Sequence, residues 1–266
     1  MFRIIYWHAG NIMGLIDLHC HLDFRQFRDD LDEVIARAKK AGVELILQNG
    51  VNPESNRKSL EIAERYKDVV RPALGIHPTD AVRMSDEAID AELDFIEKNK
   101  EMIAALGEVG IDHHWIKEAD QRKKQAECFQ KIIDLAERIR KPIIVHSWDA
   151  DQETVEMLQS SNAKKVVMHC FTGKPEIAKQ AEDEGHYFTI STNIVKSKQF
   201  RKLAKRIPME RLFTETDAPF MSPFQGKRNE PAFVAEAVRK IAEIRKIGEK
   251  EVADQISNNY DLLFRG

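Results

Sequence analysis

The sequence predicts a (β/α)8 barrel, an α/β fold in which eight parallel strands close into a ring surrounded by helices. Eight short apolar runs alternate with amphipathic helical patterns along the chain, which is typical of repeated strand-helix units. Several runs are continuously apolar, as expected for strands covered on both faces. The chain has 266 residues, close to the size of one such barrel. We therefore predict a single TIM-barrel domain over residues 14–266, preceded by an N-terminal extension over residues 1–13.

The expected strands are short aliphatic runs, each followed directly by a polar residue or a glycine. Eight such runs fit a closed barrel better than an open, doubly wound sheet. In chain order they span Leu15–Leu18, Val43–Leu47, Val69–Leu74, Met102–Leu106, Ile143–Val145, Val166–Met168, Tyr187–Ile190 and Arg211–Thr214.

The segments between the strands have apolar residues at three- and four-residue spacing, the pattern of a helix with one buried face. Ser85 is a typical helix start, and Lys141-Pro142 ends a helix before the next strand. Two helices after the eighth strand would complete the outer ring. The clearest helical patterns span Leu31–Lys40, Glu54–Tyr66, Ser85–Asn99, Gln121–Arg140, Glu230–Arg245 and Glu249–Phe264.

The composition limits the class of protein. Because the formal net charge is -3, bulk attraction to nucleic acid is not expected, although a nuclease could hold phosphates with ions and a local basic rim. No apolar run approaches the roughly 20 residues of a membrane span, and Ile4–Trp7 is too short for a secretory signal. Three scattered cysteines do not form a disulfide framework, which favours a cytoplasmic location without a membrane anchor.

Five of the expected strands carry a potential metal ligand at or just past their C-terminal end. Parallel strands in a barrel bring these ends together at one rim, where the sites of such enzymes lie. Imidazole and carboxylate groups suit Zn, Mn, Fe or Mg, and six of them could hold two ions. A turn carboxylate or a buried core histidine would explain any one of them alone, but not five coincident placements. The candidate ligands are His19, His21, Glu108, His146, His169 and Asp217.

His19 and His21 form a His-x-His motif at the end of the first strand. Side chains alternate along a strand, so this spacing turns both imidazoles to one side. The same alternation predicts that Cys20 faces away and packs, and that Cys170 also packs, beside the histidine of the sixth strand.

Three aspartates could assist the candidate ligands. Asp17 and Asp23 flank the His-x-His motif and could accept hydrogen bonds from its imidazoles. Asp217 could bind one ion while accepting a proton from the water on that ion.

Two loops have residues suited to an anionic substrate. His77, after the third strand, could contact a phosphate, although a structural turn histidine is the simpler interpretation. Arg228 and Asn229, in the loop over residues 226–231, could hold an anion at a helix start, and a capped, solvated helix start is the alternative.

Cationic and aromatic side chains near the expected rim have two interpretations each. The cationic run fits a solvated helix face, or a guide for a polyanionic strand if it borders the site. The aromatic residues could stack bases, although packing explains any single one. The cationic residues are Lys196, Lys198, Arg201, Lys202, Lys205 and Arg206, and the aromatic ones are Phe24, Trp115, Trp148 and Phe171.

From about Ile16 to Phe264 the chain resembles the TatD family of metal-dependent deoxyribonucleases in the amidohydrolase superfamily. Six motifs in family order carry the resemblance. They are Asp17-Leu18-His19-Cys20-His21-Leu22-Asp23, Gly75-Ile76-His77-Pro78, Gly107-Glu108-Val109-Gly110-Ile111-Asp112, Pro142-Ile143-Ile144-Val145-His146-Ser147, His169-Cys170-Phe171-Thr172-Gly173, and Glu215-Thr216-Asp217-Ala218-Pro219 with the 226–231 loop.

The resemblance implies a (β/α)8 barrel in which the six candidate ligands hold two divalent ions, Mg, Mn or Zn, with Glu108 as the bridge. The implied activity is phosphodiester hydrolysis, often exonucleolytic from the 3′ end of single-stranded DNA, with RNA as a substrate of some members. Four residues match positions near substrate, namely His77, Asp112, Arg228 and Asn229.

The chain departs from the family pattern at two places. Trp148 stands where the family usually has an arginine, and could replace a phosphate contact by base stacking, which would shift the preferred nucleic acid. The Asn-x-x-Arg pattern near the C-terminus reads Asn258-Asn259-Tyr260-Asp261-Leu262.

We therefore predict a metal-dependent nuclease in which Asp217 and Glu108 are catalytic while His77 and Arg228 hold the phosphate. Its expected partner is a nucleic acid substrate, without an obligate protein partner. One alternative keeps the ions but changes the bond, giving a hydrolase of a small amide or ester or a deacylase of charged tRNA. The other is a barrel that binds nucleic acid without catalysis, which six intact ligand positions disfavour.

Overall fold

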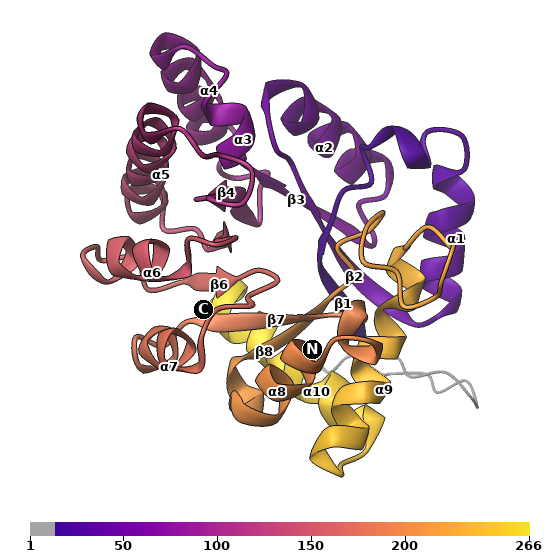
Figure 1. The fold of residues 1–266 in the computed structure, drawn as a ribbon. Helices are drawn as coiled ribbons and strands as arrows, with labels where there is room; N and C mark the ends of the chain where they lie inside the picture. Colours follow the sequence, from indigo (N-terminus) through magenta and orange to yellow (C-terminus); the bar gives the residue numbers. More distant parts are fainter. Residues whose placement is uncertain (1–13) are drawn as a thin grey trace.

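The computed structural model describes residues 14–266, so the expected extension over residues 1–13 lies outside the described residues. Within that range, eight parallel strands form one sheet in the order β1 to β8, which curls into a barrel (Figure 1). This confirms the predicted fold class. The strands are β1 (Leu15–Cys20), β2 (Val43–Asn49), β3 (Val70–Leu74), β4 (Ala105–Gly110), β5 (Ile143–His146), β6 (Val166–Met168), β7 (Tyr187–Ser191) and β8 (Leu212–Glu215).

The barrel closes between β1 and the end of β8. The backbone N–H of His21 donates to the Ala218 carbonyl at 2.8 Å, and that of Asp217 donates to the His19 carbonyl at 2.9 Å. Nearer the strand starts, the Thr214 hydroxyl donates to the Ile16 carbonyl at 2.8 Å. Closure therefore fixes the segment that carries His19 against the segment that carries Asp217.

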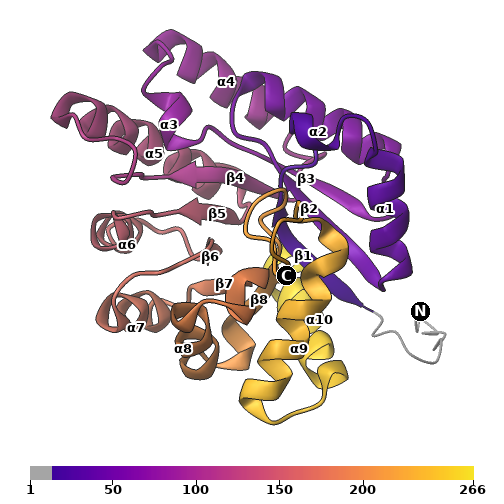
Figure 2. The ribbon, with the colours of Figure 1, turned by 45° about the vertical axis from the view of Figure 1, so that its right-hand side comes forward.

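Helices cover the outside of the barrel, and α9 and α10 lie against β1 and β8 where the ring closes (Figure 2). The predicted helix over residues 230–245 starts later than expected, because Pro231–Phe233 forms a short 3-10 turn first. The helices are α1 (Leu31–Lys40), α2 (Pro53–Arg65), α3 (Pro78–Ala81), α4 (Asp86–Lys98), α5 (Ala119–Ile139), α6 (Asp151–Gln159), α7 (Pro175–Asp183), α8 (Lys198–Arg206), α9 (Val234–Arg245) and α10 (Glu249–Tyr260).

The fourth strand is displaced from its predicted position over Met102–Leu106. Met102 is 55 % exposed in a turn, and β4 instead runs on through Glu108 to Gly110. The strand packs closely against β5, since a Cβ added at Gly107 would lie 2.7 Å from Ile144 Cβ. Only glycine fits such an approach. As a result Glu108 lies inside a strand and not in the turn after it.

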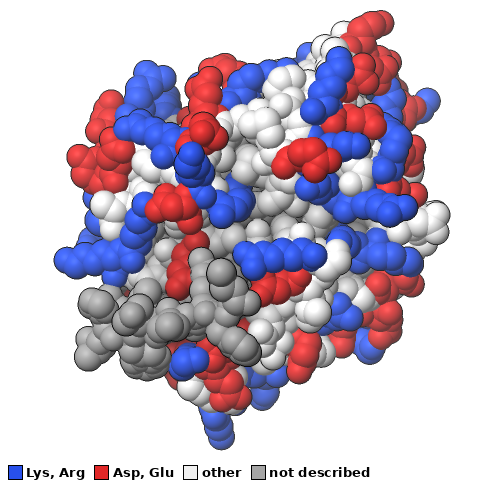
Figure 3. Space-filling model, turned by 180° about the vertical axis from the view of Figure 1, so that it is seen from behind, with Lys and Arg blue, Asp and Glu red and all other residues white. Residues whose placement is uncertain are grey.

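The face opposite the view of Figure 1 has no large area of one charge. Outside the grey atoms, Lys and Arg are interspersed with Asp and Glu over this face (Figure 3). Such mixing gives no extended field for a polyanion. Among residues 14–266, no helix is both long and apolar enough to cross a membrane.

Candidate metal centre

The six predicted ligands converge at the C-terminal rim of the barrel. Two of them, His19 and Glu108, lie within strands, and His146 ends one; His21 and His169 directly follow a strand, and Asp217 lies two residues past the end of β8. All are buried except for the edges of His146 and Asp217. They come from β1, β4, β5, β6 and β8, so barrel closure is what unites them.

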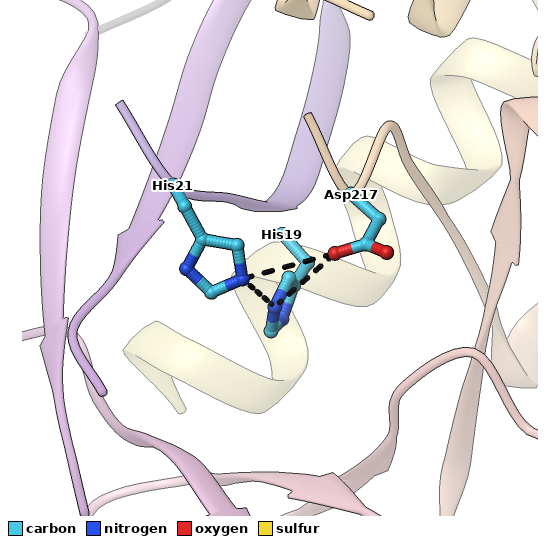
Figure 4. Close-up of side chains that lie close together, drawn as sticks. All are labelled: His19, His21 and Asp217. Atoms are coloured by element: carbon cyan, nitrogen blue, oxygen red, sulfur yellow. Dashed lines mark hydrogen bonds and ion pairs between the residues drawn. The ribbon is translucent and has the colours of Figure 1, made fainter. Parts of the chain in front are cut away.

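Three side chains, His19, His21 and Asp217, form a first group around the end of β1 (Figure 4), and Glu108 completes it. His19 Nε2 lies 3.2 Å from His21 Nε2, and each lies 3.4 Å from Glu108 Oε2. Asp217 Oδ1 lies 3.9 Å and 3.7 Å from the same two nitrogens. Donors about 2.1 Å from a tetrahedral ion are separated by about 3.4 Å. The spacing of this group therefore fits one bound ion.

A second group meets the other oxygen of Glu108. Glu108 Oε1 lies 2.9 Å from His146 Nδ1 and 3.8 Å from His169 Nε2. His169 Nε2 is also 3.9 Å from Asp217 Oδ1. The two oxygens of one carboxylate thus face two different sets of imidazoles, which is the arrangement that a bridging ligand requires.

Hydrogen bonds on the far nitrogens orient three of the imidazoles. His21 Nδ1 lies 2.9 Å from the Asn49 carbonyl, and His146 Nε2 lies 2.9 Å from Asp112 Oδ2. His169 Nδ1 lies 2.6 Å from Glu215 Oε2. A donor bond of this kind leaves the opposite nitrogen with its lone pair toward the centre, as in metal-bound histidines. The donor set therefore fits divalent cations in chemistry as well as spacing.

Burial and the Glu108 carboxylate shift the pKa values of the centre in opposite directions. Burial would raise the pKa of Glu108, but the nearby His77 and His19 and a hydrogen bond from His146 hold it well below its usual value. Burial would lower the pKa of His21, yet its hydrogen bond and charge interaction with Glu108 raise it to about 9. The pKa of Asp217 is raised to about 6 by burial. The carboxylates thus stabilise cations at this point, whether protons or metal ions.

A cavity of about 770 Å³ opens above the centre. His77 and Asp112, both predicted near substrate, line this cavity together with five of the candidate ligands. Aromatic side chains form part of its wall, and most of the other lining residues are polar, with Val51 and Met221 as apolar exceptions. The aromatic lining residues are Phe24, Trp115, Trp148, Phe200 and Phe220.

His77 offers a proton to the cavity. Its Nδ1 accepts a hydrogen bond from the Thr79 N–H at 3.3 Å, so the proton of the neutral ring is on Nε2, 3.6 Å from Glu108 Oε1. Burial lowers the pKa of His77 to about 4, which keeps the ring neutral near pH 7. As a neutral ring, His77 can therefore donate a hydrogen bond beside the metal centre, where it also forms a group of close donor atoms with Glu108 and His146.

Comparison with known proteins identifies the family. The family model for TatD-related DNases matches residues 16–265. The chain belongs to the TatD family. It is 34 % identical over 260 residues to the human deoxyribonuclease TATDN3, with 95 % of each chain covered. It is 37 % identical over 259 residues to the metal-dependent hydrolase YabD of Bacillus subtilis, covering 94 % of this chain and 99 % of the relative.

A solved structure of the TatD homologue YjjV from Escherichia coli has the same fold. Its TM-score is 0.88 at 28 % sequence identity, and the match covers 96 % of this chain and 99 % of that one. Together with the family match, this makes the TatD-family chain a metal-dependent hydrolase of the amidohydrolase superfamily.

Arg228 and Asn229 do not line the cavity of this TatD-family protein, contrary to the expectation that they contact substrate. The Arg228 guanidinium pairs with both oxygens of Asp30, at 2.8 Å and 2.7 Å, and lies over the Phe27 ring. The fully buried Asn229 amide donates to the Thr216 and Phe220 carbonyls, each at 2.7 Å. Both side chains fix the loop after β8, because neighbouring acceptors already occupy their donors.

We expected from the sequence that Asp17 and Asp23 would orient the imidazoles of His19 and His21. In the structure neither aspartate does so. Asp17 accepts hydrogen bonds from the Thr216 N–H and hydroxyl, at 2.7 Å and 2.6 Å, and thereby joins β1 to β8. Asp23 accepts from Gln48 and Ser55 on the neighbouring segments. The Asn49 carbonyl, and not an aspartate, orients the ring of His21. His19 Nδ1 is buried without a hydrogen-bond partner among residues 14–266.

Glu215 is the residue near the centre that sequence reasoning missed. It is fully buried, and its Oε1 also accepts from the Cys170 N–H at 3.1 Å. Glu215 directly follows the expected strand Arg211–Thr214, and this is the placement that marked the other candidates, so the same criterion could have revealed it.

The two cysteines beside candidate ligands, Cys20 and Cys170, differ in position. Cys20 is buried and packs away from the centre, as predicted. Cys170, predicted to pack, instead lines the cavity, because β6 ends at Met168 and a φ of 44° at Cys170 breaks the alternation. Burial raises the pKa of the Cys170 thiol well above its usual value, so the thiol stays protonated.

Proposed function

We propose that this TatD-family hydrolase is a phosphodiesterase that shortens single-stranded DNA from the 3′ end, with RNA as a further substrate. The observation that carries the proposal is the position of Glu108, whose two oxygens face two groups of donors on the floor of one cavity. Two divalent ions, Mg, Mn or Zn, bound by these groups would supply an activated water and neutralise charge on the phosphoryl group.

His19, His21, Asp217 and Glu108 would hold one ion, and His146, His169 and Glu108 would hold a second. Asp217, whose pKa burial raises to about 6, would accept the proton of the attacking water. His77 donates its Nε2–H to a phosphate oxygen. Asp112 holds His146 through one carboxylate oxygen and lines the cavity in which the substrate would lie.

A cationic pocket beside the cavity favours a polyanionic substrate. It has a volume of about 310 Å³ and shares Thr172 and Gln199 with the main cavity. Of the cationic run on α8, Lys202 and Arg206 line this pocket, and Lys174 joins them from the start of α7. A phosphate backbone leaving the centre toward α7 and α8 would meet these charges.

Other members of the cationic run have local roles, and Arg206 itself also donates to the Pro175 carbonyl. Lys196 donates to the Ser222 carbonyl at 2.9 Å, and Arg201 donates to the Ile194 carbonyl at 2.9 Å. Both therefore stabilise loops. The pocket residues, and not the run as a whole, support the proposed path of the nucleic acid.

Two further points support the proposal. The human relative TATDN3 is named a deoxyribonuclease, which favours DNA over a small amide, an ester or a charged tRNA. All three cysteines are free thiols, which favours the cytoplasm as the place of action.

The test is degradation of end-labelled single-stranded DNA by metal-stripped protein to which Mg, Mn or Zn is added back. We expect metal-restored shortening from the 3′ end, reduced by orders of magnitude in Asp217→Asn and Glu108→Gln. Asp254→Asn on the outer face of α10 serves as the matched control. No cleavage by protein that binds metal normally would favour the small-molecule or acyl-tRNA hydrolase, to be tried with those substrates.

A further inference from the structure

Two tryptophans on the cavity wall are exposed to an unusual degree. Trp115 is 66 % exposed and Trp148 is 43 % exposed, although both line the cavity above the metal centre. Large aromatic side chains are normally buried, as Phe129 and Phe188 are here. Exposed aromatic surface inside a cavity marks a place where a ligand completes the packing.

The two indoles and His114 form an ordered group. The Trp148 ring stacks on the His114 ring at a centroid distance of 3.9 Å and an interplanar angle of 7°. The Trp115 ring stands at 85° to Trp148, 6.2 Å away, and at 89° to His114. One face of Trp148 is thus covered by His114, so its exposed area includes the opposite face.

This group is fixed relative to the metal centre. One oxygen of Asp112 accepts from the backbone N–H of Trp115 at 2.6 Å, and the other oxygen faces His146. The His113 N–H donates to the Trp148 carbonyl at 2.9 Å, which ties the loop after β4 to the loop after β5. The aromatic surface and the candidate ligand His146 therefore share the same support.

Acidic side chains outnumber the one lysine, Lys117, on the two loops that carry the tryptophans, which disfavours an anion as the direct ligand of the indoles. Asp112, Asp149, Asp151 and Glu153 lie on the same two loops and at the start of α6. A phosphate would be repelled here, whereas the cationic pocket lies across the cavity on α7 and α8. A flat, uncharged, aromatic group fits the surface, and a nucleobase is such a group within a nucleic acid.

We propose that Trp148 and Trp115 form a subsite that stacks one unpaired base of the substrate beside the scissile phosphate. The inference rests on the proposed nuclease function and deepens it, because stacking on Trp148 requires a base that no partner strand holds. The subsite makes single-stranded ends the preferred substrate. At a paired end the two strands must first separate, so its cleavage is slower.

Binding is measured first, with a single-stranded oligonucleotide and the Asp217→Ala protein, so that cleavage does not interfere. The chain has three tryptophans, and a Trp7→Phe background leaves only the two in the subsite as fluorescent reporters. We expect quenching of indole fluorescence on binding, and a Kd raised about 5- to 50-fold by Trp148→Ala. Trp148→Phe should retain most of the affinity, and Phe224→Ala, an exposed aromatic outside the cavity, should not change it.

A second measurement separates stacking from a structural role. Oligonucleotides with a single abasic site at successive positions from the 3′ end are compared. For one position, loss of the base should weaken binding to the parent protein by the same factor as Trp148→Ala, and should have no further effect in that variant.

Three outcomes are distinguished. Equal losses from the abasic site in the parent protein and in Trp148→Ala would overturn the subsite. Unchanged Kd in both Trp148→Ala and Trp115→Ala would do the same while leaving the nuclease proposal intact. No binding of any oligonucleotide by the protein in which Trp115 and Trp148 are both intact would overturn the proposed function, and the subsite with it.

Discussion

Glu215 Oε2 lies 2.6 Å from His169 Nδ1, and both side chains are almost completely buried. The same carboxylate accepts the Cys170 N–H, so one side chain from β8 holds both the ring of His169 and the backbone that follows it. Burial would raise the pKa of Glu215, but the charge of His169 and its hydrogen bond keep it below its usual value. His169 is thereby presented to the centre as a strong base through Nε2.

We expect Glu215→Gln to weaken metal binding about 10- to 100-fold with little change in fold. Glutamine has the same shape, but its single carbonyl oxygen cannot replace both acceptor oxygens, and the charge that supports His169 is lost. Metal titration calorimetry measures the effect, and circular dichroism checks the fold. An unchanged metal Kd would show that His169 needs no such support.

Asn229→Ala should lower the free energy of unfolding by about 2 to 4 kcal/mol, because it leaves buried carbonyl acceptors without a donor. Chemical denaturation measures this loss. Arg228→Ala should have a smaller effect, since its pair with Asp30 is partly exposed. Neither change removes a group that lines the cavity, so the Kd for single-stranded DNA should stay within about twofold. A tenfold weaker Kd in Arg228→Ala would instead restore it as a substrate contact.

Lys202→Ala should weaken binding of single-stranded DNA, and reduce the slope of log K against log salt by about 0.7, the loss of one phosphate contact. Lys205→Ala is the matched control, because Lys205 is an exposed lysine on the same helix that does not line the cationic pocket. Binding titrations over a range of salt concentrations give both slopes. Equal slopes for the two variants would argue against a path over α8.

His186 should make stability fall in mild acid. Burial lowers the pKa of this histidine to about 4, below its unfolded value near 6.5. The unfolded chain therefore binds the proton first as the pH drops, and stability is lost between about pH 6.5 and pH 4. The parent protein should lose about 2 kcal/mol more than His186→Gln between pH 7 and pH 5. Urea denaturation at both pH values measures the difference, and parallel losses in the two proteins would contradict the assignment.

The sequence by itself determined the barrel and the six convergent candidate ligands. Apolar runs of strand length alternating with helical patterns leave few folds, and parallel closure puts all strand ends at one rim. Once His19, Glu108 and Asp217 were assigned to strand ends, their proximity followed from topology, without knowledge of any side-chain contact.

Only the tertiary structure decided which partner each polar side chain takes. Asp17 binds Thr216 and not an imidazole, and Arg228 pairs with Asp30 and not with a phosphate. Such choices depend on loop conformations and on side chains distant in sequence, which periodicity does not encode. Strand alternation holds only while the strand lasts, so it was right for Cys20 and wrong for Cys170, where the backbone had already turned.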